Sequence, residues 1–152
     1  MTIAIQRAST TDLETLSRIE QECFTVEAFS KRQIASLLKT SASVKLLAKA
    51  NEEVAGFVIG LLHDYGDVKL GHIVTIDVVP RYRRRGVGMK LLQEVERELQ
   101  KGGVGVCYLE VRADNAAAKK LYEKLGYREV EVLEDYYYRG GHGIRLEKTL
   151  LF

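Results

Sequence analysis

The sequence contains little of what marks secreted, membrane-spanning or linker-rich proteins. Cys23 and Cys107 are its only cysteines in 152 residues, too few for a disulfide framework. Pro80 is the single proline and no Pro/Ser-rich stretch divides the chain, so we expect one domain over residues 1–152. The longest apolar run, residues 54–62, contains two glycines and is far shorter than the roughly 20 residues of a membrane-spanning helix.

The opening residues lack a basic segment followed by an apolar run, so we expect no signal peptide and a cytoplasmic, reduced protein. The formal net charge is only +2, which argues against a general binder of polyanions and leaves anion binding to a local cluster. His63, His72 and His142 are scattered, and no Cys/His cluster has the spacing of metal ligands. We therefore predict no metal site.

Hydrophobic periodicity predicts alternating strands and helices, in the order β-α-α-β-β-β-α-β-α-β-β. The expected elements are a short strand near Ile3, helices over 12–23 and about 30–38, strands over 44–50, 54–63 and 71–79, a helix over 87–101, a strand over 104–111, a helix over 115–125, and strands over 127–133 and 144–150. The pattern indicates a mixed α/β class in which helices cover one sheet.

Arginines and glycines gather in residues 81–89, RYRRRGVGM, between the end of one predicted strand and the start of a predicted helix. A helix N-terminus presents unpaired backbone N–H groups and partial positive charge, which favours anion binding. Gly86 and Gly88 have no Cβ, so a diphosphate can approach the backbone closely. The arginines add attraction for a polyanionic ligand.

Two other interpretations of this segment stay open from the residue types alone. It would also serve as a plain glycine turn with a solvated basic rim, because short glycine patterns are weak evidence. A nucleic-acid patch would use Tyr82 for base stacking. The near-neutral total charge and the lack of a second basic stretch disfavour that interpretation.

Two longer motifs make a resemblance specific. Arg83-x-x-Gly86-x-Gly88 after a strand resembles the signature of the GNAT acetyltransferase superfamily, and it differs from a dinucleotide fingerprint. Residues 109–127, LEVRADNAAAKKLYEKLGY, look very like the RimI-type ribosomal-protein and N-terminal α-amine acetyltransferases. Residues 71–76, GHIVTI, resemble the archaeal and eukaryotic N-terminal acetyltransferases. The match spans about half the chain and implies a mostly antiparallel sheet of about seven strands with about four helices.

The resemblance implies acetyl-coenzyme A (acetyl-CoA) as cosubstrate. In these enzymes the glycine turn binds the pyrophosphate of CoA, and the preceding strand pairs with its pantetheine arm. The matching residues of this chain are Ile76, Asp77, Val78, Arg83, Arg84, Arg85, Gly86, Val87, Gly88, Met89, Asn115 and Tyr122.

Acetyl transfer to an amine requires a neutral amine. A free α-amine has a pKa of about 8 and Lys one of about 10.4, so a modest general base suffices for the α-amine. The resemblance implies Glu110 as this base, His72 as a second candidate, and Tyr122 as the proton donor to the leaving thiolate. We expect direct transfer in a ternary complex, because strand alternation places Cys107 on the face opposite Glu110.

Each of these side chains also has a purely structural interpretation. Glu110 would then be a solvated strand residue, His72 a satisfied strand histidine, and Tyr122 part of the core. Asn115 is a good helix N-cap in its own right.

The family resemblance places one wall of the acceptor groove at Phe24 and Phe29. It places the other at Tyr136 and Tyr137, in the expected loop of the final hairpin. Tyrosines suit a peptide backbone because they offer a flat apolar face and a hydroxyl, and cross-strand aromatic packing is the other interpretation. Asp77 departs from the family pattern, in which the residue is small or apolar. It is expected to face the acceptor amine or solvent.

Further departures lie on the acceptor side, at residues 28–30 (Ala-Phe-Ser in place of Pro-Trp-Ser) and 142–143 (His-Gly in place of an acidic residue and Ala). The leading prediction is acetylation of a protein or peptide N-terminal α-amine. The alternatives are a small amine or a Lys side chain as acceptor, or a CoA-binding module without turnover. We expect neither a nucleic acid nor a membrane as partner. The sequence does not determine whether an auxiliary subunit or the ribosome takes part.

Overall fold

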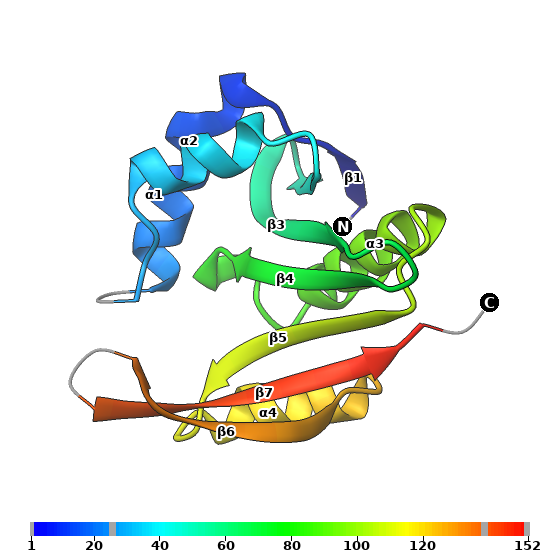
Figure 1. Ribbon diagram of the computed structural model, residues 1–152. Coiled ribbons are helices and arrows are strands. Elements are labelled where there is room, and N and C mark those ends of the chain that lie inside the picture. Colours follow the sequence, from blue (N-terminus) through cyan, green and yellow to red (C-terminus); the bar gives the residue numbers. More distant parts are fainter. Residues whose placement is uncertain (1, 25–26, 138–139, 151–152) are drawn as a thin grey trace.

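The computed structural model describes residues 2–24, 27–137 and 140–150, and it forms one sheet with helices on both faces (Figure 1). The strands are β1 (Ile3–Arg7), β2 (Ser43–Ala50), β3 (Glu53–Asp64), β4 (Lys69–Val78), β5 (Val106–Arg112), β6 (Arg128–Tyr137) and β7 (Gly141–Thr149). The helices are α1 (Leu13–Cys23), α2 (Lys31–Lys39), α3 (Val87–Lys101) and α4 (Ala116–Lys124), with short 3-10 turns at Thr10–Asp12 and Pro80–Tyr82. The predicted order and mixed class are confirmed.

The described part of the chain forms a seven-stranded sheet in the order β1-β2-β3-β4-β5-β7-β6. All neighbours are antiparallel except β4 and β5, which run parallel and are joined through α3. This parallel pairing covers only three residue pairs, from Leu70–Val106 to His72–Tyr108. Beyond His72 the two strands diverge (Figure 1), so the sheet opens along the second half of β4.

A β-bulge in β4 changes which side chains face each side of the sheet. Gly60 pairs with Ile73 and Ile59 pairs with Thr75, so Val74 is the extra residue. An extra residue reverses the alternation of side chains along a strand. The side chains after Val74 therefore point to the opposite face from the one that simple alternation predicts.

The contacts on either side of the bulge show this reversal. A Cβ on Gly71 would lie 2.9 Å from Leu99 of α3, so the neighbouring His72 faces away from α3. After the bulge, the Thr75 hydroxyl lies 3.0 Å from Glu20 of α1. His72, Thr75 and the later odd-numbered residues of β4 thus share the face on which α1 packs.

Helix α3 packs its apolar stripe against the central strands and carries much of the core. Its bounds agree with the predicted helix over 87–101. The stripe is almost fully buried and consists of Val87, Leu91, Leu92, Val95 and Leu99. Because the first residue of α3 belongs to this stripe, packing fixes the start of the helix beside the open end of β4. No helix among the described residues is both long and apolar enough to cross a membrane.

Candidate active site

A histidine and a glutamate from neighbouring strands meet where β4 and β5 begin to diverge. The Nε2 atom of His72 lies 2.7 Å from Oε1 of Glu110. The other carboxylate oxygen of Glu110 accepts a hydrogen bond of 3.2 Å from Nε of Arg145. The Glu110 side chain is only 8% exposed. The structure thus joins the two predicted base candidates in one hydrogen-bonded group.

The surroundings of Glu110 have opposing effects on its pKa. Burial acts to raise the pKa, but the hydrogen bonds and positive charge from His72 and Arg145 outweigh it and hold the pKa below its usual value. Glu110 is therefore ionised at neutral pH and is a weak base by itself. When His72 donates from Nε2 to this carboxylate, the lone pair of the neutral ring is on Nδ1.

The imidazole of His72 is also held by ring stacking. The planes of the His72 and Tyr108 rings differ by 5°, and their centroids are 4.6 Å apart. The Arg145 guanidinium lies over the Tyr108 ring, 5.3 Å from its centroid. Tyr108 and Arg145 were not predicted from the sequence. Arg145 pairs with Glu110 across β5 and β7, so a correct strand register would have placed opposite charges side by side.

The glycine turn leads into α3 through backbone conformations that suit close approach of a ligand. Arg84 and Gly86 both have left-handed backbones, with φ of 62° and 84°. Gly86 is the N-cap of α3 and provides no side-chain acceptor for the first amides of the helix. Open amides at a helix start are the donors that a diphosphate requires. The segment is thus a turn opening a helix, as predicted.

The end of β4 is tied to this turn by an arginine. Nε of Arg83 donates to the Val78 carbonyl at 3.0 Å, and Cys23 lies 3.4 Å from the same oxygen. A Cβ on Gly88 would lie 3.4 Å from Val78, so the start of α3 lies directly against the open strand. On this part of β4, the side chains of Ile76 and Val78 are half-buried.

The expectation that Asp77 faces either solvent or the acceptor amine needs correction. Its side chain is 1% exposed, and Oδ1 lies 2.6 Å from the Thr75 hydroxyl, so Asp77 does not face solvent. The cause is the bulge at Val74, which turns this side chain beneath α1. Only the backbone of Asp77 belongs to the open strand.

Helix α4 presents two of the predicted residues. Asn115 is its N-cap, and Oδ1 accepts a hydrogen bond of 3.1 Å from the amide of Ala118. Tyr122 packs edge-on to Tyr127 at a centroid distance of 5.9 Å. Burial, with a smaller contribution from the charge of Asp77, raises the pKa of the Tyr122 phenol, so this hydroxyl keeps its proton at neutral pH. The capping and packing interpretations are thus both true of the geometry, and neither excludes contact with a ligand.

The residues predicted to form the first acceptor wall lie between α1 and α2. Phe24 and Phe29 are both half-buried, and residues 25 and 26 between them lie outside the described residues. The amide of Phe29 donates to Oε2 of Glu20 at 3.0 Å, and its carbonyl accepts from Gln21 at 3.2 Å. Two side chains of α1 thus hold the backbone at Phe29.

The residues predicted to form the second wall lie in a strand, which corrects the prediction of a long loop. Tyr136 and Tyr137 lie at the end of β6, which is longer than predicted, and their rings meet edge-on at 5.0 Å. Arg112 lies 5.5 Å from the Tyr137 ring centroid and pairs with Glu27 at 2.6 Å. Arg112 thus links the two segments that carry the predicted walls.

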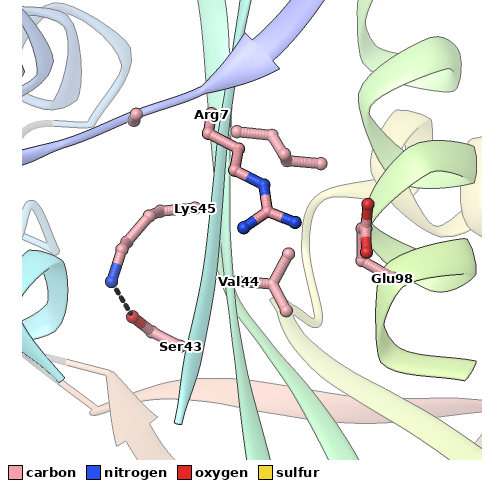
Figure 2. Close-up of a pocket in the computed structure, with 7 residues that line it drawn as sticks. Arg7, Ser43, Val44, Lys45 and Glu98 are labelled. Carbon is pink, nitrogen blue, oxygen red and sulfur yellow. Dashed lines mark hydrogen bonds between the residues drawn. The ribbon is translucent and has the colours of Figure 1, made fainter. Parts of the chain in front are cut away.

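The cavity in Figure 2 is separate from these residues. It has a volume of about 110 Å³ and lies between β1, β2 and α3, where Arg7, Val44 and Glu98 line it. None of the predicted site residues contributes to it. Within the described ranges, His, Cys, Asp and Glu side chains form no group of three suited to a metal ion.

The fold and the site define an acetyltransferase of the GNAT class. Residues 13–127 match the Acetyltransferase (GNAT) family, and the chain belongs to this family. It is an enzyme that takes its acetyl group from acetyl-CoA. The left-handed turn, the open helix start and the unpaired edge of β4 are features into which a diphosphate with an extended arm fits.

Individual relatives narrow the comparison. The N-alpha-acetyltransferase of Sulfurisphaera tokodaii is 32% identical over 146 residues, covering 90% of this chain and 86% of that protein. The [ribosomal protein bS18]-alanine N-acetyltransferase of Salmonella typhimurium is 35% identical over 129 residues, covering 85% and 83%. The solved ribosomal-protein-S18-alanine N-acetyltransferase from Escherichia coli has a TM-score of 0.88 at 31% identity, covering 99% and 96% of the two chains.

We expect Glu110→Gln to lower the free energy of unfolding by about 1–3 kcal/mol at pH 7, because two hydrogen bonds to a charged group are weakened. Folding lowers the pKa of Glu110, so the stabilisation is present above its usual pKa of 4.5 and is lost as the pH falls through the folded value. The difference between wild type and variant in urea unfolding should therefore shrink at pH 4. Glu123→Gln, at an exposed position of α4, is the control, and a difference independent of pH would contradict the assignment.

Proposed function

We propose that this enzyme acetylates the N-terminal α-amine of a protein or peptide, by direct transfer in a ternary complex. The observation that carries the proposal is the group formed by His72, Glu110 and Arg145. Glu110 stays ionised because its pKa is held low, and it orients the His72 imidazole that takes the proton. Such a modest base suits an α-amine with a pKa near 8 better than a Lys amine near 10.4. The names of the relatives, which are N-alpha and alanine N-acetyltransferases, support the same acceptor.

In the proposed reaction the neutral amine attacks the thioester carbonyl carbon and the carbon–sulfur bond breaks. The proton lost by the amine goes to His72, which Glu110 orients and whose positive charge it stabilises. The sulfur leaves as a thiolate and accepts a proton from Tyr122, whose buried phenol keeps its proton until that step. Backbone amides near Val78 polarise the carbonyl. The products are an amide and CoA thiol.

The proposed cosubstrate site follows the open strand and the turn. Donors for the diphosphate are the first amides of α3, and the pantetheine arm lies along the unpaired edge of β4. The residues proposed for this role are Ile76, Asp77 and Val78 through their backbone, Arg83, Arg84, Arg85, Gly86, Val87, Gly88 and Met89 at the turn, and Asn115 and Tyr122 on α4.

The proposed acceptor groove lies between the two aromatic walls, at Phe24 and Phe29 on one side and Tyr136 and Tyr137 on the other. Tyr136 is 48% exposed and therefore available for contact with a peptide. The Glu27–Arg112 ion pair, at 2.6 Å, links the segment that carries Phe29 to the end of β5.

A panel of amines tests the proposed function. At pH 7.5 the difference between the two amine pKa values makes the neutral fraction of an α-amine about two hundredfold larger than that of Lys. We expect kcat/KM, measured by mass spectrometry, to be about two hundredfold or more higher for peptides with a free N-terminus than for N-terminally blocked peptides with an internal Lys. Preference for the blocked peptides would indicate a Lys acetyltransferase. Absence of acetyl gain on every amine would leave only a CoA-binding module.

We expect His72→Gln and Glu110→Gln each to lower kcat roughly a hundredfold, because each breaks the proton-accepting group. The double variant should be no slower than the slower single variant, since residues that act as a unit are not additive. The KM for acetyl-CoA should stay within about twofold, because neither side chain lies at the glycine turn. His63→Gln, whose ring stacks 6.4 Å from that of His72, is the matched control. Multiplicative losses in the double variant would show that the two residues act separately.

Gly86→Ala tests the diphosphate site. A left-handed backbone at a residue with a Cβ is strained, so the binding-competent turn becomes less populated and CoA binds about tenfold more weakly in calorimetry. Gly105→Ala is the control, because its added Cβ meets nothing within 4 Å and it lies outside the turn. Equal CoA affinity in both variants would remove the turn from the cosubstrate site.

A further inference from the structure

Three polar side chains are buried together between α1 and β4, beside the open part of the sheet. Glu20 and Asp77 are each 1% exposed, and Thr75 between them is 6% exposed. The Thr75 hydroxyl oxygen lies 3.0 Å from Oε1 of Glu20 and 2.6 Å from Oδ1 of Asp77. Two carboxyl groups thus share one hydroxyl in a site that excludes water.

Counting hydrogens shows that this cluster holds an additional proton. A threonine hydroxyl has one hydrogen and can donate it to only one of the two carboxyl groups. The second contact needs a hydrogen from the carboxyl group itself. Two ionised carboxylates at this separation would also repel each other in a low dielectric. One of Glu20 and Asp77 is therefore protonated.

The hydrogen-bond partners assign the proton to Asp77. Oε2 of Glu20 accepts a hydrogen bond of 3.0 Å from the amide of Phe29. If the Thr75 hydroxyl donates to Oε1, an ionised Glu20 has a donor at each of its two oxygens. Oδ2 of Asp77 is buried and has no hydrogen-bond partner, so an ionised Asp77 would be poorly compensated. The 2.6 Å contact suits a carboxylic O–H that donates to the hydroxyl oxygen.

The electrostatics of the surroundings agree with this assignment. Burial, followed by the neighbouring carboxyl group of Glu20, raises the pKa of Asp77 to about 9, against smaller opposing effects of Thr75 and Arg83. The other titratable groups that face Asp77 are Cys23 on α1 and Tyr122 on α4. Burial raises the pKa of Cys23 to about 11 and raises that of Tyr122 as well, so both stay neutral where Asp77 titrates.

We propose that protonated Asp77, Thr75 and Glu20 are positioning residues that fasten the acceptor wall at Phe29 to the cosubstrate strand. The chain of contacts runs from Asp77 on β4 through Thr75 and Glu20 to the Phe29 amide. It fixes the distance between the groove that receives the amine and the strand that presents the thioester. This inference rests on the proposed function, and it gives a role to the carboxylate that departs from the family pattern.

Three variants test the positioning role. Asp77→Asn replaces the protonated acid by an amide that can donate to Thr75, so it should preserve the bridge and raise the KM for the peptide far less than Thr75→Val does. Thr75→Val keeps the shape but removes the bridge, and loss of a hydrogen bond to the charged Glu20 should raise the KM for the peptide about tenfold. The KM for acetyl-CoA should stay within about twofold. Thr75→Ser should restore the wild-type values.

Carbon-13 NMR of protein labelled at the aspartate carboxyl groups tests the proton directly, without turnover. One aspartate resonance should titrate only at alkaline pH and should be missing from Asp77→Asn. Folding favours the protonated acid, so the stability that Asp77 contributes falls as pH rises between its usual pKa of 3.8 and about 9. The melting temperature of Asp77→Asn should therefore rise relative to wild type from pH 5 to pH 8.

The outcomes separate this inference from the proposed function. If no amine is acetylated by the wild type, the proposed function fails, and the NMR titration still decides the proton on Asp77. If peptides are acetylated but Asp77→Asn raises the peptide KM as much as Thr75→Val does, protonated Asp77 is not what positions the acceptor wall, and the inference is overturned. If Thr75→Val raises both KM values equally, or if no aspartate titrates at alkaline pH, the inference is overturned.

Discussion

The short parallel pairing of β4 with β5 is the constraint on which the rest of the site depends. Three residue pairs hold the strands together, and beyond His72 they diverge. On one face α3 is the crossover, so its first amides lie beside the unpaired edge of β4. On the other face the last pair stacks His72 on Tyr108, and Glu110 follows on β5. The divergence of these two strands thus brings the proposed diphosphate turn and the proposed proton-accepting group to the two sides of a single opening.

Two carboxyl groups at this opening are driven to opposite protonation states by their partners. Glu110 accepts hydrogen bonds from His72 and Arg145, and its pKa is lowered despite burial. Asp77 has a second carboxylate as its neighbour and no partner at Oδ2, and its pKa is raised. When the pKa values of two nearby acids are shifted in opposite directions, one acid is ionised and the other protonated at the same pH, so the two can serve different roles. Here ionised Glu110 lies next to the His72 imidazole, and protonated Asp77 belongs to the contacts proposed to hold the backbone at Phe29.

Much of the fold could be predicted from local pattern. The apolar stripe of α3, with a glycine at each end, predicted its bounds as residues 87–101, and periodicity predicted the order of helices and strands along the chain. The motif with Glu110 and Tyr122 was placed on the predicted strand and helix. In each case the information is local: a repeat of apolar residues, a cap or a turn.

What could not be predicted depends on partners far away in the chain. The bulge at Val74 is set by pairing with β3, and it turns the Asp77 side chain from the sheet face covered by α3 to the face covered by α1, where it is buried. The contact of Arg145 with Glu110 requires the register of β5 with β7. Pairing with β7 also extends β6 through Tyr136 and Tyr137, where local pattern indicates a loop. Register is a property of two strands, so one strand's sequence does not contain it.

The two cysteines bear on how the acetyl group moves. A covalent acyl-enzyme on sulfur requires a thiolate, and burial raises the pKa of Cys107 to about 12 and that of Cys23 to about 11. Cys107 is completely buried on the strand face opposite Glu110, as alternation predicts. Cys23 donates its weak hydrogen bond to Val78 and has two carboxyl groups as neighbours, which disfavour a thiolate further. Neither sulfur is therefore available as an intermediate acceptor, and this favours direct attack of the amine on the thioester across the opening between β4 and β5.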